Sequence, residues 1–153
     1  MDLPDAKDPL DLDRQVCFPL YAASNLLNRI YRPILADLGL TYPQYLVMLA
    51  LWKQVPQTVG SLGEALYLDS GTLTPLLKRM EAAGLITRNR DAADERRVLI
   101  DLTPKGRALR TEALRVPEAL AEGLDIDASD VEGLRDQVRR LVAALHGSPH
   151  LKP

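Results

Sequence analysis

The stretch that decides the fold is YLDSGTLTPLLKRMEAAGLITRNRDAADERR, residues 67–97. In its first half, apolar side chains recur at positions i, i+3, i+4 and i+7, namely Leu73, Leu76, Leu77 and Met80. This spacing predicts a helix with one buried face and a polar, cationic opposite face. Pro75 favours a start at Gly71 or Thr72, because a proline in the first turn of a helix leaves no hydrogen bond unmade.

The second half of the stretch predicts a small β-hairpin. Gly84 supplies the left-handed residue that ends many helices, and LITRNRDAADERRVLIDLT (85–103) reads as two short strands joined by a charged loop. A helix followed by a basic hairpin is the outline of a winged helix-turn-helix that binds DNA. The expected DNA-binding residues are Ser70, Thr72, Thr74, Lys78, Arg79, Arg88, Arg90, Asp94, Arg96 and Arg97.

These residues divide by chemistry. Hydroxyl side chains at the helix start suit base edges or phosphates, whereas Lys78 and Arg79 suit the phosphate backbone. We expect Arg96 to enter the minor groove at the wing tip, oriented by Asp94, and the other hairpin arginines to contact phosphates.

The charge of the chain is unevenly distributed. The net charge is −2, and acidic residues predominate over residues 1–13 and 118–136. Over residues 70–100 cationic side chains outnumber acidic ones, and such a local basic surface can bind phosphate on an acidic protein. Charge alone is explained equally well by a solvated face.

The flanking segments are predominantly helical in pattern. Residues 1–12 read as a flexible acidic arm. Asp11 or Asp13 is expected to cap a long helix to about Leu38, which Pro19 should kink or delay. Further helices are expected over residues 40–52, capped by Thr41, over 59–66, from Thr103 and Pro104 to about 120, and from Asp127 or Ser129 to about 145.

The resulting fold class is mainly α with a small β-wing. We expect one domain over residues 13–153, in which a winged helix-turn-helix unit (57–103) is flanked by dimerisation helices (13–56 and 104–146). A two-fold dimer would present two recognition helices roughly 34–36 Å apart, which matches a palindromic operator in double-stranded DNA.

The sequence offers little support for a membrane, secreted, metal-binding or enzymatic protein. The apolar run LTYPQYLVMLALW (40–52) is too short to span a bilayer, and the acidic N-terminus does not resemble a signal peptide, so we expect a cytoplasmic protein. His146 and His150 lack partners at metal-ligand spacing, and no nucleotide or catalytic-triad motif occurs. We expect no enzymatic activity and no cofactor.

Two runs resemble a known family. CFPLYAASNLLNRIYRPILADLGLTYPQYLVMLALW (17–52) and LYLDSGTLTPLLKRMEAAGLITRNRDAADERRVLIDLTPKG (66–106) are similar to the MarR family of winged-helix regulators, and specifically to its organic-hydroperoxide-sensing repressors, OhrR. The resemblance covers about residues 15–106 and weakens towards 145. Asp94 and Arg96 match the general wing signature of the family. The resemblance implies a homodimeric repressor.

Cys17 is the one cysteine of the chain, which excludes an internal disulfide. A lone cysteine is ordinarily a small buried hydrophobe, but the start of a helix favours a thiolate. Tyr21 lies four residues, or about one helical turn, after Cys17, on the same face of the expected helix. Tyr31 lies roughly 21 Å further along a straight helix, so it can serve Cys17 only from another subunit.

The resemblance implies the same arrangement. It makes Cys17 the peroxidatic residue, with Tyr31 and Tyr42 donated across the dimer and Tyr21 nearby. An organic hydroperoxide would oxidise Cys17 to a sulfenic acid and release the operator. With no second cysteine, the chain would be of the one-cysteine type, resolved by a small thiol as a mixed disulfide or over-oxidised. Tyr45 and Tyr67 are expected to be ordinary interface anchors.

Two alternatives remain at this point. A MarR-family repressor released by a non-oxidising small phenolic or aromatic ligand would share the fold but would not need Cys17. A thiol peroxidase would need a recycling partner cysteine, which the chain lacks.

Overall fold

The computed structural model describes residues 8–151. Residues 1–7 of the predicted acidic arm lie outside the described residues. The chain forms two compact units, the first ending at Ala119 and the second beginning at Leu120. Each unit is described separately below.

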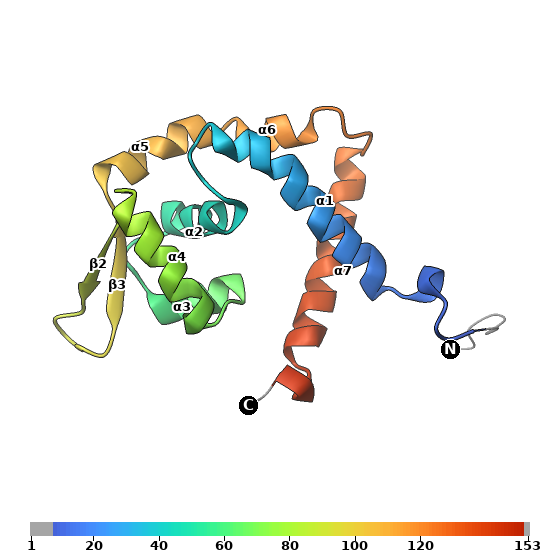
Figure 1. Ribbon diagram of the computed structural model, residues 1–153, viewed down its shortest axis with the longest axis horizontal. Coiled ribbons are helices and arrows are strands. Elements are labelled where there is room, and N and C mark those ends of the chain that lie inside the picture. The colour runs from blue at the N-terminus through green and yellow to red at the C-terminus, as the bar shows by residue number, and fades with distance from the viewer. Residues whose placement is uncertain (1–7, 152–153) are drawn as a thin grey trace. The chain divides into compact units, whose positions relative to one another are not determined.

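The elements of the first unit are the 3₁₀ turn η1 (Leu12–Arg14), α1 (Cys17–Ala36), α2 (Tyr42–Lys53), β1 (Gln57–Thr58), α3 (Val59–Leu66), α4 (Ser70–Ala82), β2 (Ile86–Arg90), β3 (Val98–Leu102) and α5 (Pro104–Ala113) (Figure 1). The remaining elements are α6 (Val116–Ala121), α7 (Ala128–His146) and the 3₁₀ turn η2 (Pro149–Leu151). The predicted class, mainly α with a small β-wing, is confirmed.

The first helix begins later than its predicted caps. Asp11 caps η1 instead, where its carboxylate accepts a hydrogen bond from the Asp13 N–H at 3.1 Å. The helix therefore does not start at Asp11 or Asp13. The alternative of a later start, indicated by Pro19, is confirmed, because α1 begins at Cys17. Pro19 falls in the first turn, where its missing N–H leaves no carbonyl of the helix unpaired.

The second helix is the centre of the first unit. Thr41 caps it as predicted, because the Thr41 hydroxyl accepts from the Gln44 N–H while the Gln44 side chain accepts from the Thr41 N–H. The helix contacts α1, α3, α4 and α5. Its buried side chains are Tyr45, Val47, Met48 and Leu51.

The recognition helix α4 begins earlier than predicted. The Asp69 carboxylate accepts a hydrogen bond from the Thr72 N–H at 2.7 Å, which fixes Ser70 as the first helical residue. Pro75 therefore lies inside the helix, and the prediction of a start at Gly71 or Thr72 is wrong. Pro75 has no N–H, so the Gly71 carbonyl lacks its usual hydrogen bond within the helix.

The wing is a three-stranded antiparallel sheet in the order β1-β3-β2. The hairpin pairs Ile86 with Leu102 and Arg90 with Val98. The sequence predicts this hairpin but not β1, because a strand of two residues, Gln57–Thr58, is too short to show alternation. Gly84 has φ +76°, which confirms its predicted role at the end of α4.

The helix after the wing is shorter than predicted. Thr103 caps α5 through its hydroxyl, as expected, but the predicted helix from 104 to about 120 is interrupted at Leu114 and Arg115. Pro117 explains the break, because it has no N–H to donate to the Ala113 carbonyl. A Cβ atom on Gly106 would overlap the backbone of Leu85, so only glycine lets α5 lie this close to the start of β2.

The second unit consists mainly of α7. Asp127 precedes its first residue, and the helix extends to His146, close to the predicted bounds. None of its residues is buried, and its exposed apolar side chains include Val131, Leu134 and Leu145. A helix with an uncovered apolar face is expected to gain stability from a packing partner.

Candidate DNA-binding surface and redox site

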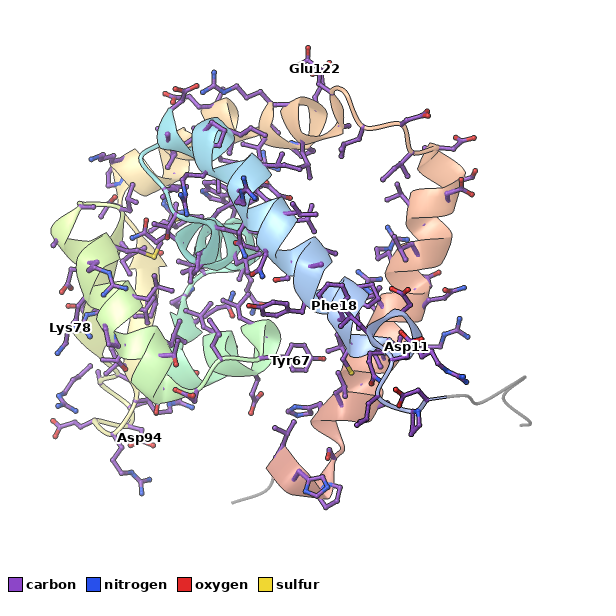
Figure 2. The ribbon with its side chains drawn as sticks, turned by 45° about the vertical axis from the view of Figure 1, so that its right-hand side comes forward. Asp11, Phe18, Tyr67, Lys78, Asp94 and Glu122 are labelled. Atoms are coloured by element: carbon purple, nitrogen blue, oxygen red, sulfur yellow. The ribbon has the colours of Figure 1, made fainter. Side chains whose placement is uncertain are left out.

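The recognition helix separates its apolar and polar side chains as the sequence predicts. Leu73, Leu76, Leu77 and Met80 are buried, whereas Ser70, Thr72, Lys78 and Arg79 are exposed and Thr74 is half-buried. Lys78 points away from the body of the first unit (Figure 2). The five polar residues proposed for DNA therefore share one helix with a solvent-accessible face.

The turn before α4 is set by two backbone constraints. Tyr67 ends α3 in the left-handed region, with φ 55°. A Cβ atom on Gly63 would lie 2.7 Å from the Leu68 carbonyl oxygen, so glycine allows the chain to fold back against α3. Nothing in the sequence marks Gly63 as a functional residue, because a glycine within a helical pattern looks the same with or without a close backbone contact.

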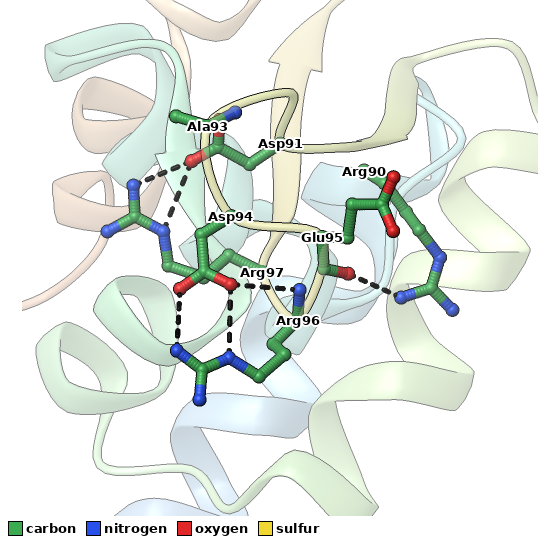
Figure 3. Close-up of polar contacts among 7 residues, drawn as sticks. All are labelled: Arg90, Asp91, Ala93, Asp94, Glu95, Arg96 and Arg97. Atoms are coloured by element: carbon green, nitrogen blue, oxygen red, sulfur yellow. Dashed lines mark hydrogen bonds and ion pairs between the residues drawn. The ribbon is translucent and has the colours of Figure 1, made fainter.

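At the wing tip, Asp94 orients Arg96 as predicted. The Asp94 carboxylate accepts from Arg96 Nε at 3.1 Å, from Nη2 at 3.4 Å and from the Arg96 backbone N–H at 3.1 Å (Figure 3). These hydrogen bonds from Arg96 lower the pKa of Asp94. The Arg96 side chain is 91% exposed, so its guanidinium is held at the surface without being covered.

The base of the same loop is closed by Asp91 and Arg97. Asp91 Oδ2 accepts from Arg97 Nη2 at 2.6 Å and from Nε at 3.1 Å, and the Asp91 N–H donates to the Arg97 carbonyl at 2.9 Å (Figure 3). The side-chain hydrogen bond from Arg97 is the main cause of the lowered pKa of Asp91. Arg97, predicted as a phosphate contact, therefore also fixes the shape of the loop.

Two other predicted phosphate contacts have partners within the chain. Glu81 accepts from the Arg88 N–H at 3.1 Å and from Arg88 Nε at 3.3 Å, which ties α4 to β2. Arg90 Nη1 donates to the Glu95 carbonyl at 2.7 Å. Glu81 and Asp91 thus hold the wing in shape by accepting hydrogen bonds from Arg88 and Arg97. Both acids stand out in the sequence only as minority charges in a basic segment.

Three tyrosines form a cluster between α1 and α2. The ring centroids of Tyr31 and Tyr42 lie 4.5 Å apart, and the Tyr45 ring lies 6.0 Å from the first and 6.5 Å from the second. The structure therefore brings two predicted sensing residues together. Tyr45 is 5% exposed within the chain, so the expectation that it is an interface anchor is wrong.

The cluster keeps its phenols protonated. Burial, together with the neighbouring Tyr42 and Tyr45, raises the pKa of Tyr31 to about 12. Burial also raises the pKa of Tyr42 and of Tyr45. At neutral pH all three side chains are hydrogen-bond donors, which is the form that binds a thiolate or another anion.

Cys17 lies far from this cluster along its own helix. Cys17 and Tyr21 are both exposed near the start of α1, and Tyr21 is 67% exposed. One continuous helix connects Cys17 to Tyr31, so roughly 21 Å of helix axis separates the thiol from the cluster of the same chain. Each chain therefore holds two halves of the predicted redox site without joining them.

Comparison with known proteins identifies the family to which the chain belongs. Residues 29–112 match the family model described as the transcriptional regulator SarA/Rot. The organic hydroperoxide resistance transcriptional regulator of Bacillus subtilis is 46% identical over 139 residues, covering 91% of this chain and 95% of that protein. The chain belongs to the MarR family, in its OhrR branch.

Solved structures extend the match to proteins on DNA. The structure of reduced AbfR bound to DNA is 37% identical with a TM-score of 0.73, covering 88% of this chain and 93% of that chain. Over-oxidised AbfR bound to DNA is 40% identical with a TM-score of 0.69, covering 85% and 94%. AbfR is a protein of Staphylococcus epidermidis. A MarR-family regulator thus shares the fold described here.

Over residues 8–151, no helix combines the length and apolarity needed to cross a bilayer. The same residues contain no group of three or more His, Cys, Asp or Glu side chains placed to hold a metal ion.

The tyrosine cluster predicts a delayed phenol titration. The difference in phenolate absorbance between the protein and a Tyr31→Phe variant should develop near pH 12, because burial raises the pKa of Tyr31 in the folded chain. The unfolded chain has an ordinary tyrosine pKa of about 10. The contribution of protonated Tyr31 to the free energy of unfolding is therefore complete below about pH 10 and is lost as the pH rises towards 12. A difference that develops near pH 10 in the folded protein would contradict the cluster.

Proposed function

We propose that the chain acts as a homodimeric repressor that senses organic hydroperoxides through Cys17 and then releases a palindromic operator. The observation that carries the proposal is the separation of Cys17 from the Tyr31–Tyr42 pair within one chain. A site that needs both groups is complete only when one subunit supplies the thiol and the other supplies the phenols.

Exposed apolar surface supports the dimer. Val16, just before α1, and Leu27 and Ile30 within it form an apolar stripe with the spacing of a buried helix face, yet they are 66%, 41% and 37% exposed within the chain. The apolar face of α7 is likewise uncovered. Pairing of these helices with a second copy would bury both faces, and burial of apolar area stabilises association.

The sensing chemistry follows from the residues. The Cys17 thiolate attacks the terminal oxygen of the hydroperoxide, so that the S–O bond forms while the O–O bond breaks. The sulfur is oxidised to a sulfenic acid and the hydroperoxide is reduced to an alcohol, whose alkoxide oxygen takes up a proton. Tyr31 and Tyr42 of the other subunit, with Tyr21 nearby, would hold the thiolate through their O–H groups.

The fate of the sulfenic acid decides how DNA is released. The proposed resolution is attack by a small thiol, which gives a mixed disulfide and water, with over-oxidation to a sulfinate as the second route. AbfR in its over-oxidised form is described as bound to DNA, which favours the mixed disulfide as the releasing species. The bulk of the mixed disulfide would separate the tyrosine O–H groups from the Cys17 sulfur and strain the paired helices.

On DNA, each subunit would use the face described above. Ser70, Thr72 and Thr74 would reach bases or phosphates in the major groove, and Lys78 and Arg79 would contact the phosphate backbone. Arg96, held by Asp94, would enter the minor groove, where negative potential attracts a guanidinium. Arg88, Arg90 and Arg97 would contact phosphates with the guanidinium N–H groups that their intrachain partners leave unused.

Cys17→Ser tests the sensor. The reduced protein and the variant should both shift a palindromic promoter probe in a gel titration. Cumene hydroperoxide with a small thiol should release only the wild-type protein, and reductant should restore its binding, because serine cannot form the sulfenic acid.

Two other outcomes have clear meanings. If both proteins are released equally, or if neither is released, Cys17 is not the switch. A MarR-family repressor controlled by a non-oxidising phenolic or aromatic ligand would then be the better account.

Arg96→Ala tests the wing. Loss of a groove-inserted arginine should weaken operator binding by about 1–3 kcal/mol, measured by gel titration at fixed salt, because no other side chain replaces the guanidinium in the groove. Arg115→Ala is the matched control, because Arg115 pairs with Asp37 instead of lying on the wing. Equal effects of the two substitutions would contradict the role of Arg96.

A further inference from the structure

A cavity of about 330 Å³ opens beside the tyrosine cluster. Asn28 and Arg32 line it from α1, Tyr42 and Pro43 from α2, and Leu40 and Thr41 from the segment between them. Its size lies within the range of small-molecule sites. Because the Tyr31 and Tyr42 rings stack at 4.5 Å, the cavity is one ring away from Tyr31.

Arg32 is the charged residue of this cavity. Among residues 8–151 its guanidinium makes no ion pair or hydrogen bond, and no carboxylate lines the cavity with it. The nearby Asp37 carboxylate is held by Arg115 at 3.3 Å. A guanidinium left without an anion beside an apolar wall suits a ligand that joins a carboxylate to a hydrocarbon chain.

We infer that Arg32 binds the carboxylate of the hydroperoxide that oxidises Cys17, so that the site prefers carboxylate-bearing organic hydroperoxides. This inference rests on the proposed function, in which Cys17 of the other subunit meets Tyr31 and Tyr42. The carboxylate pairs with Arg32, the chain lies along Leu40 and Pro43, and the O–OH group reaches the thiolate. The alcohol formed when the O–O bond breaks leaves with its carboxylate intact.

Asn28 places a second polar group on the same side. Its amide Nδ2 donates to the Ser24 carbonyl at 3.0 Å, which fixes the side chain along α1. Arg32 lies one helical turn further along, so both side chains line the cavity from one face of the helix. The carboxylate is thus recognised at the α1 wall and the hydrocarbon at the opposite wall.

The test compares two forms of one hydroperoxide. The rate of Cys17 thiol loss is measured with linoleic acid hydroperoxide and with its methyl ester, in which one added methyl group removes the negative charge of the carboxylate. The wild-type protein should react about five- to tenfold faster with the acid, as expected for one charge-assisted contact at an exposed site. Arg32→Gln should remove this advantage and leave the rate with the ester unchanged, and added salt should reduce the advantage in the wild type.

Arg29→Gln is the matched control. Arg29 is an exposed arginine of the same helix that does not line the cavity, so this variant should keep the wild-type ratio of rates. The inference is overturned if the wild-type ratio is near one, or if Arg32→Gln leaves the ratio unchanged.

A second arm separates the hydroperoxide from the resolving thiol, which can also carry a carboxylate. The sulfenic acid is reacted with mercaptopropionate and with the neutral mercaptoethanol. If Arg32→Gln slows only the reaction with mercaptopropionate and has no effect on either hydroperoxide, Arg32 serves the thiol and the assignment is wrong.

A third arm separates failure of the inference from failure of the proposed function. The neutral tert-butyl hydroperoxide should oxidise Cys17 at the same rate in the wild type and in Arg32→Gln. If it does so without any carboxylate preference, only the Arg32 assignment fails. If no hydroperoxide oxidises Cys17, the sensor itself fails.

Discussion

The length of α1 is the constraint on which the rest of the account depends. An uninterrupted helix from Cys17 to Ala36 holds the thiol and the Tyr31 ring roughly 21 Å apart, and no side chain spans that distance. A redox site built from both must therefore join two chains. The same requirement explains why the apolar stripe of α1 is exposed in one chain, since in the proposed dimer it faces a second copy.

The first unit also offers a physical route from the proposed redox site to the proposed DNA-binding surface. Tyr45 lies in the tyrosine cluster and in the buried face of α2, which contacts α3, α4 and α5. At the other end of α2, Trp52 Nε1 donates to the Gly106 carbonyl at 2.9 Å, and Gly106 packs against Leu85, the residue just before β2. Because packed cores rearrange as units, a shift of α2 would move the recognition helix and the wing together.

The sequence predicts the elements more reliably than their limits. Apolar spacing is repeated over many residues, so the recognition helix, the hairpin and the last helix are all found. A helix start depends on one hydrogen bond, and the Asp69 cap overrides the expectation based on Pro75. The Asp94–Arg96 pair is local and predictable, whereas the Glu81–Arg88 tie and the burial of Tyr45 depend on contacts between distant elements that spacing does not encode.

The central claim is that Cys17 of one subunit works with the tyrosines of the other. Heterodimers that combine a Cys17→Ser chain with a Tyr31→Phe, Tyr42→Phe chain test it most directly. If the site joins two chains, the remaining Cys17 faces intact tyrosines, and the heterodimer should be oxidised at the wild-type rate per thiol. The converse heterodimer, with all three substitutions in one chain and none in the other, should react slowly. Slow oxidation in the first heterodimer and fast oxidation in the second would place the site within one chain and contradict the account.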